Sequence, residues 1–348
     1  ILGDVPPAAF SEHPFFFKKP VGTGPYRLVE YVENQYVLFE RNETYFRGRP
    51  HIEKINWLII DSSVKAAGLE KGEIDLTSNP PVADMERFID NPNFKIRWQP
   101  SVVFCNFPVN VERVPKKIRQ AISYAIDRQA VTDEFLLGSR NGIPWYTHFG
   151  HEWLHFESMY SYDPDKAKAL VQEAIADGDW TADRKLDVAF TGGEPSDALV
   201  FMAQQIEAAG IKVEMRSVGT GAASQEELHI KRNYDIAWGC NEWGPDPTWV
   251  EMYYRCGMTL DKGGYNNLNF CSPEVDELFD KGRFTLDQEE RAKYYRQLAQ
   301  IVDEEALRVN IYRSVTAWVM NKRVMDATPE YYGSMPNYNA IEKWWLSE

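Results

Sequence analysis

The stretch that decides the fold reads LDVAF at residues 186–190, IKVEMR at 211–216 and YDIAWG at 234–239. Each of these segments is short and rich in the apolar residues of a buried strand. The segments between them have the apolar spacing and the end signals of helices, over residues 196–209 and 224–231. Strands that alternate with helices in this way predict an α/β fold with a mostly parallel sheet.

The chain on both sides of this stretch shows more elements. Pro115 and the pair Asp163-Pro164 are typical of helix starts, because proline fits the first turn and aspartate caps it. The length of 348 residues suggests two domains, at about 150 residues each. We expect further helices at residues 115–137, 163–178, 273–284 and 287–305, and strands at 26–33, 35–41, 55–60, 74–76, 308–312 and 315–321.

The charge of the chain is strongly negative. Its 38 basic and 52 acidic residues give a net charge of −14. Such a surface repels phosphate backbones and anionic lipid headgroups, which argues against nucleic acid or a membrane surface as a partner. Apolar runs such as residues 57–60 are far shorter than the roughly 20 residues of a spanning helix. Residues 1–7 lack the features of a signal peptide, so we expect them to come from the interior of a longer chain.

Four cysteines leave two interpretations open. Cys105, Cys240, Cys256 and Cys271 form no C-x-x-C pair, which argues against a zinc ribbon. If the protein is exported, a bridge from Cys256 to Cys271 would close a short loop and stabilise the fold. Otherwise the four residues are free, buried thiols.

The sequence His151-Glu152-Trp153-Leu154-His155 matches H-E-x-x-H. On a helix, this spacing lets both histidines ligate zinc while the glutamate activates water. The flanks oppose a long helix, because glycine and proline crowd the upstream side and a new helix starts at Asp163. We therefore interpret the segment as a surface loop and expect no metal site, with a weak alternative site at His151 and His155.

A group of tryptophans and polar side chains follows the third strand of the deciding stretch. Ligand crevices of open α/β sheets form at the carboxyl ends of such strands. Indole rings offer stacking area, and carboxylate and amide groups offer directional hydrogen bonds. The predicted ligand-binding residues here are Trp238, Asn241, Glu242, Trp243, Asp246 and Trp249.

Several motifs, in their order and spacing, resemble the extracellular solute-binding proteins of family 5, which include the oligopeptide- and dipeptide-binding components of ABC importers. The resemblance extends over nearly the whole chain. The matching stretches are VGTGPY at 21–26, ERNETYF at 40–46, GEIDL at 72–76, IRQAISYAIDR at 118–128, YDPDKAKAL at 162–170, YDIAW at 234–238 with Asp246-Pro247, and residues 269–278.

The resemblance implies a periplasmic-binding-protein-like (type II) fold with two hinged lobes, of which the N-terminal portion is missing here. Residues 1–106 and 317–348 would form a partial first lobe. Residues 107–316 would form the second lobe around a mixed or parallel sheet. Hinges are expected near Asn106 and Thr316.

The resemblance also implies a function. The chain would be the substrate-binding subunit of an ABC importer, which closes over a small solute, here a peptide, and delivers it to an inner-membrane permease. It would be a monomer in the periplasm or another extracytoplasmic space, with a lipid anchor as an alternative, and it would be no enzyme and need no cofactor. Asn106 and Asn266 complete the ligand-binding set that we predict.

One departure from the family pattern keeps other ligands open. In peptide-binding relatives, an aspartate a few residues after the tryptophan that matches Trp238 pairs with the α-amine of the ligand. Asn241 and Glu242 occupy that place here, and Glu242 can supply the charge. The three tryptophans make an oligosaccharide or opine an alternative ligand. Alternatives of another class are a zinc hydrolase and the ligand-sensing domain of a transcriptional regulator.

Overall fold

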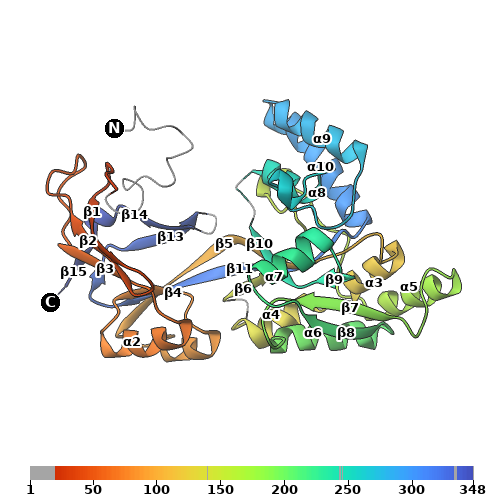
Figure 1. The fold of residues 1–348 in the computed structure, drawn as a ribbon, viewed down its shortest axis with the longest axis horizontal. Helices are drawn as coiled ribbons and strands as arrows, with labels where there is room; N and C mark the ends of the chain where they lie inside the picture. The colour runs from red at the N-terminus through yellow and green to blue at the C-terminus, as the bar shows by residue number, and fades with distance from the viewer. Residues whose placement is uncertain (1–19, 139, 243, 245, 333–334, 348) are drawn as a thin grey trace. The chain divides into compact units, whose positions relative to one another are not determined.

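The computed structural model describes residues 20–138, 140–242, 244, 246–332 and 335–347 (Figure 1). The chain divides into two compact units. The first unit contains the chain up to Gln99 and again from Thr316, and the second contains Pro100–Val315. The lobe boundaries expected from the resemblance, at residues 106 and 317, remain a prediction.

The first unit is built mainly from antiparallel strands. The predicted strand-turn-strand is confirmed, because β1 (Tyr26–Val32) pairs with β2 (Tyr36–Arg41), and Asn34 in the turn adopts a positive φ of 58°. Helix α2 (Lys65–Lys71) ends at Gly72, whose φ is 72°. The remaining strands are β3 (Lys54–Leu58), β4 (Leu76–Ser78), β12 (Val324–Met325), β13 (Thr328–Tyr332), β14 (Met335–Asn339) and β15 (Trp345–Leu346).

The second unit contains the parallel sheet that the deciding stretch predicts. Strand β7 (Lys185–Phe190) lies between β8 (Lys212–Ser217) and β9 (Ile236–Ala237) and is parallel to both. Helix α6 (Asp197–Ala208) connects β7 to β8 and is capped by Ser196, whose hydroxyl accepts from the Leu199 amide. The helix expected before β9 begins as α7 (Ala222–Gln225) and continues as a π-helix, Glu226–Lys231.

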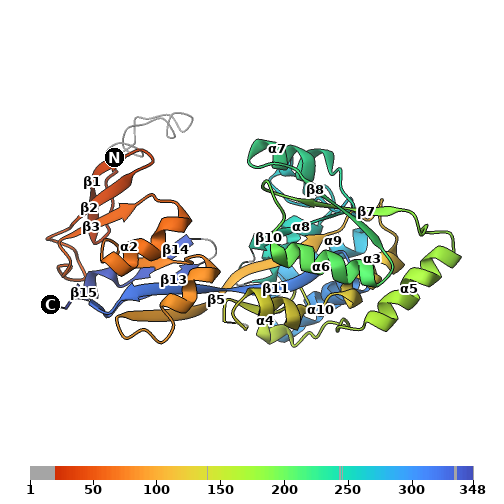
Figure 2. The same ribbon diagram turned by 90° about the horizontal axis from the view of Figure 1, so that it is seen from below.

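Helices cover this sheet and the strands beside it (Figures 1 and 2). The single helix predicted over residues 115–137 is wrong, because the structure has two. The chain turns at Asp127, whose carboxylate caps the second helix by accepting from the Ala130 amide. Besides α6 and α7, the helices of the second unit are α3 (Lys116–Ala125), α4 (Arg128–Phe135), α5 (Pro164–Ala176), α8 (Glu251–Tyr254), α9 (Pro273–Phe284) and α10 (Gln288–Glu304).

Two long strands belong to both units. They are β5 (Phe94–Pro108) and β11 (Arg308–Asn321). We expected two strands in the second of these segments, and the structure has one continuous strand. The short strand β6 (Gly142–Pro144) pairs with β11, and β10 (Gly239–Glu242) pairs with β5.

The two largest apolar cores of the described residues lie in the second unit. One lies between the parallel sheet and α3, α5 and α6, and includes Ile118, Val188 and Ile206. The other lies around α8, α9 and α10 and includes Tyr254 and Phe279. The loop that follows β10 packs on the second core, because Val250 belongs to it.

Asp303 is a buried carboxyl group at the end of α10. Its Oδ2 accepts from the Met159 amide at 3.2 Å, and the Tyr160 hydroxyl donates to its backbone oxygen at 2.8 Å. Burial raises the pKa of Asp303 to about 6, although hydrogen bonds from Ser158 and Met159 and the charge of Arg128 favour the ionised form. The ordinary value is 3.8, so folding favours the protonated group.

The Asp303 pKa predicts a pH-dependent stability. Because the pKa of Asp303 is higher in the folded state than in the unfolded state, the protonated carboxyl group stabilises the fold. This stabilisation is complete below about pH 4 and is lost as the pH rises through about 6. Asp303→Asn should therefore raise the free energy of unfolding at pH 8 by at most about 3 kcal/mol, with little effect at pH 4. Urea unfolding at both pH values measures this. Asp179→Asn, at an exposed aspartate, is the control, and an equal effect of both substitutions would contradict the prediction.

Candidate functional site

The candidate site is carried by β10 and its partner β5. Gly239 lies opposite Asn106, Cys240 opposite Cys105, and Glu242 opposite Val103. Successive side chains on a strand point to opposite faces. Cys240 and Glu242 therefore share one face of this pair of strands, and Asn241 lies on the other.

Both pairs of cysteines are disulfide-bonded, so the interpretation as free thiols is wrong. Cys105 and Cys240 are joined directly across the strand pair, with Cα atoms 4.0 Å apart. Cys256 and Cys271 close the short loop that the sequence offered as one of two possibilities. The bridge from Cys105 to Cys240 was not predicted, because its partners are 135 residues apart and only the pairing of β5 with β10 brings them together.

Trp238 directly precedes β10, and the alternation of side chains along the strand puts it on the same face as Cys240 and Glu242. The indole packs 4.9 Å from the Phe107 ring and 6.2 Å from the Tyr312 ring, measured between centroids. Trp238 is half-buried, and so is Glu242. Among the residues that the structure describes, no ion pair or side-chain hydrogen bond engages the Glu242 carboxylate. This face thus combines an aromatic wall with an uncommitted negative charge.

The opposite face holds a buried polar network. Arg308 is only 4% exposed, and its Nη1 donates to Oδ1 of Asn106 at 3.2 Å and to Oδ1 of Asn241 at 3.1 Å. Its Nη2 donates to Asn267 Oδ1 at 3.3 Å. The amide of Asn106 also donates to Asn241 at 3.3 Å. Asn106 and Asn241 thus meet each other, but they face the interior with Arg308 rather than lying beside Glu242.

Tyr253 connects this network to the backbone of the strand. The Arg308 guanidinium lies 4.9 Å from the centre of the Tyr253 ring. The Tyr253 hydroxyl donates to the backbone oxygen of Glu242 at 2.9 Å. Burial raises the pKa of Tyr253 to about 12, which keeps the hydroxyl a donor. The Tyr253 hydrogen bond therefore fixes the backbone of Glu242, while the Glu242 side chain points to the face opposite Asn241.

The loop after β10 is held by an ion pair. Asp246 accepts from Nη1 of Arg291 at 2.5 Å and from Nη2 at 2.7 Å, and it caps the 3₁₀ turn Pro247–Val250. Burial alone would raise the pKa of Asp246, but the hydrogen bonds from Arg291 and Thr248 outweigh it and lower the pKa to about 2. Asp246 thus has a structural partner.

Of the other predicted residues, Trp249 lies in the turn Pro247–Val250, and Asn266 lies in the following loop, between α8 and α9. Trp249 is 49% exposed, and its indole covers Gly244 so closely that a Cβ there would clash. Asn266 is buried: both its amide hydrogens and its carbonyl oxygen bond to backbone groups of its own loop, at Arg255, Phe270 and Leu268. Trp243 lies outside the described residues.

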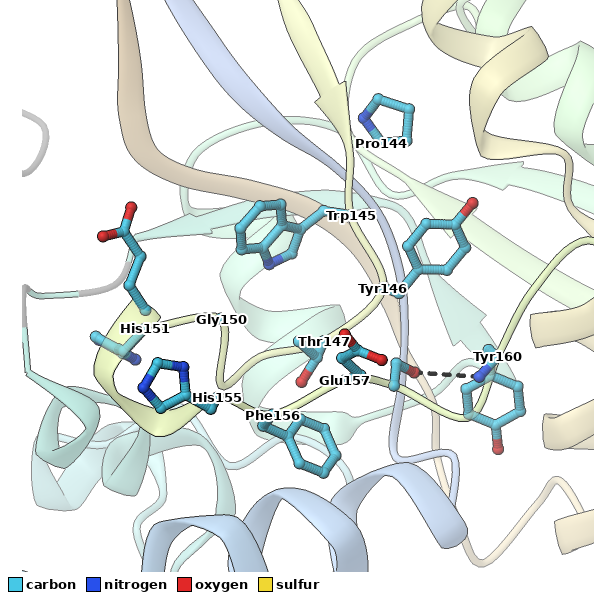
Figure 3. A pocket seen from close by; sticks show the side chains of 12 residues that line it. Pro144, Trp145, Tyr146, Thr147, Gly150, His151, His155, Phe156, Glu157 and Tyr160 are labelled. Carbon is cyan, nitrogen blue, oxygen red and sulfur yellow. Dashed lines mark hydrogen bonds between the residues drawn. The ribbon is translucent and has the colours of Figure 1, made fainter. Parts of the chain in front are cut away.

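The H-E-x-x-H segment forms no α-helix. Glu152–Leu154 is a single 3₁₀ turn, and His155 follows with a positive φ of 48°. His151 Nε2 lies 3.2 Å from the backbone oxygen of Gly244, and burial lowers the His151 pKa. No group of three metal-ligating side chains occurs among the described residues. The segment lines a cavity of about 510 Å³ within the second unit (Figure 3). No helix in the described part of the chain is long and apolar enough to cross a bilayer.

Comparisons with known proteins agree with this architecture. The oligopeptide-binding protein AppA of Bacillus subtilis is 26% identical, over 100% of this chain and 66% of its own length. Heme-binding protein A of Haemophilus influenzae is 25% identical, over 90% of this chain and 58% of its own length. The chain thus spans less than two thirds of these relatives.

A solved structure shows the same fold. The ABC transporter substrate-binding protein CtaP of Listeria monocytogenes superposes with a TM-score of 0.82 at 26% identity, over 95% of this chain and 68% of that one. The family model described as bacterial extracellular solute-binding proteins, family 5 Middle, matches residues 3–265. This match covers well over half of the chain. The chain therefore belongs to family 5 of the bacterial extracellular solute-binding proteins, a family of binding proteins rather than enzymes.

Proposed function

We propose that this chain is part of the substrate-binding subunit of an ABC importer, and that it binds a peptide. In this proposal the subunit acts as a monomer outside the cytoplasm, closes its two lobes over the peptide and delivers it to a membrane permease. AppA, named as an oligopeptide-binding protein, supports the proposal because the match covers the whole length of this chain.

The observation that carries the proposal is the placement of Glu242. Its carboxylate shares a face of the β5–β10 pair with Trp238 and has no cationic partner among the described residues. An α-ammonium group carries the complementary charge and three hydrogen-bond donors. A charge-assisted hydrogen bond in a half-buried place contributes about 1.5–3 kcal/mol. The Trp238 ring offers apolar area to the side chain next to that amine.

The test compares peptides with free and acetylated N-termini. The unmodified chain should bind the free form more tightly, and Glu242→Gln should weaken that binding about tenfold to a hundredfold while leaving the acetylated form nearly unchanged. Isothermal titration calorimetry measures both affinities. Glu194→Gln, at an exposed glutamate of the same unit, is the control.

Two outcomes would overturn the proposal. If Glu242→Gln has no more effect than Glu194→Gln, the carboxylate does not bind the amine. If a neutral oligosaccharide binds and no peptide does, the saccharide alternative holds. The name of Heme-binding protein A shows that cargo differs among relatives, so these arms are needed.

A further inference from the structure

The cavity beside the H-E-x-x-H segment is formed entirely by residues of the second unit, and its lining includes no residue of β10, although His151 Nε2 lies 3.2 Å from the backbone oxygen of Gly244. It has a volume of about 510 Å³, enough for a small organic molecule. Its lining comes from one continuous stretch of chain between β6 and α5, residues 144–160. Figure 3 shows the side chains of this stretch around the opening.

The walls of this cavity are aromatic. Trp145, Tyr146 and Phe156 line it, and each is half-buried, so each ring exposes part of its surface. Trp145 is fixed by packing 5.4 Å from the Phe104 ring, and Gly150 lies so close to the indole that a Cβ there would clash. The aromatic walls are therefore held in place by the fold. The faces of such rings carry negative potential and attract cations.

The acidic group at this cavity is Glu157. Figure 3 labels Glu157 among the side chains that line the cavity. The side chain is exposed, and no ion pair or hydrogen bond to it is found among the described residues. A second carboxylate, Glu152, also lines the cavity.

Besides Arg296, which donates from Nη1 to the Leu154 oxygen at 3.1 Å, two guanidinium groups lie near the walls but not in the lining. Arg128 is 1% exposed, lies 4.6 Å from the centre of the Tyr146 ring, and donates to the backbone oxygens of Ser123, Ile126 and Asn310. Arg313 lies 5.6 Å from the centre of the Trp145 ring, and its Nε donates to the Ser101 oxygen. Both cations are thus engaged by backbone groups. The charged groups that line the cavity itself are carboxylates, with His151 and His155 beside them.

We infer that this cavity is a second binding site, separate from the Glu242 site, and that it takes a small organic ammonium ion. The ammonium group would pair with Glu157, and its alkyl part would pack on Trp145 and Phe156. Arg128 approaches the Tyr146 ring at 4.6 Å, closer than Arg313 approaches the Trp145 ring at 5.6 Å, so Trp145 and Phe156 provide the aromatic surface for the ligand. This inference does not depend on the peptide proposal.

The test uses three probes with the same alkyl chain: n-butylammonium, n-butyrate and n-butanol. They are titrated by ligand-detected NMR into the Glu242→Gln chain, which removes the carboxylate of the proposed peptide site. We expect n-butylammonium to bind about tenfold more tightly than n-butyrate. Adding Glu157→Gln should weaken n-butylammonium about fivefold and leave n-butanol unchanged.

Controls separate the site from general effects of charge and folding. Glu194→Gln in the same background should change the affinity for n-butylammonium by less than twofold. Because Glu157 is exposed, its substitution should leave the melting temperature unchanged. Phe156→Leu should weaken n-butylammonium about threefold, which tests the aromatic wall. Equal binding of n-butyrate, or a loss with Glu157→Gln no larger than with Glu194→Gln, would overturn the inference.

Discussion

Replacing Cys105 and Cys240 together by alanine should lower the free energy of unfolding of the second unit by about 5 kcal/mol. The bridge closes a loop of 135 residues, and the entropy that a cross-link removes from the unfolded chain grows with loop length. The second bridge, from Cys256 to Cys271, spans only 15 residues, so its removal should cost about 3 kcal/mol. Guanidinium unfolding of both double variants, followed by circular dichroism, measures the difference.

The two double variants are matched controls, because both bridges lie within Pro100–Val315. A loss that is equal for both, or larger for the short loop, would contradict the loop-entropy argument. The long bridge has a second role in the peptide proposal. Strand β10 is four residues long and lies at the edge of its sheet, and the bridge ties it to β5 one residue before Asn241. Peptide affinity should therefore fall in the Cys105/Cys240 variant and stay unchanged in the other.

The second large effect is expected for Arg308→Met, which should lower the free energy of unfolding by about 4 kcal/mol. Methionine fills a similar volume but donates no hydrogen bond. The oxygens of Asn106, Asn241 and Asn267 would lose the Arg308 donor, and an unsatisfied buried acceptor costs about 1–3 kcal/mol. Removing the buried Arg308 charge lowers the desolvation cost of folding, which often offsets the loss of hydrogen bonds. Here the side-chain amides that Arg308 served stay buried, so a net loss of stability is expected.

Arg308→Lys and Arg140→Met complete this experiment. Lysine keeps the charge but cannot reach several oxygens with one planar group. The free energy of unfolding of Arg308→Lys should therefore lie between that of the unmodified chain and that of Arg308→Met. Arg140 is exposed, so its replacement should cost less than about 0.5 kcal/mol. Peptide binding by Arg308→Lys gives a second readout, because a displaced Asn241 would move the strand that carries Glu242. A loss below about 1 kcal/mol for Arg308→Met would show that the network does not stabilise β10.

Local sequence patterns were sufficient for most elements of the second unit. The spacing of apolar residues predicted α6 and the strands on both sides of it, and proline and aspartate signals located the start of α5. These patterns work because helices and strands bury one face at a fixed period. The break between α3 and α4 was missed, since Asp127 interrupts the helix without disturbing the apolar spacing.

The candidate site was only partly predictable. The sequence shows that Asp246, Asn241 and Asn266 are polar, as Glu242 is. It does not show which of these polar groups are already hydrogen-bonded within the protein. Arg308 was not predicted, because nothing in its surroundings in the sequence distinguishes it from an exposed arginine. A signal existed only in the tertiary contacts, where one guanidinium joins three asparagines from three other segments.

The sequence by itself determined the α/β class, the parallel order of the deciding stretch and the motifs of family 5, because these depend on local periodicity and on residues near one another in the chain. Only the tertiary structure decided how the cysteines pair and which face of β10 each candidate side chain occupies. It placed Glu242 and Trp238 on one face and Asn106 and Asn241 on the other, with Arg308. The physical reason is that strand pairing joins segments more than 130 residues apart, and the register of that pairing decides which groups meet.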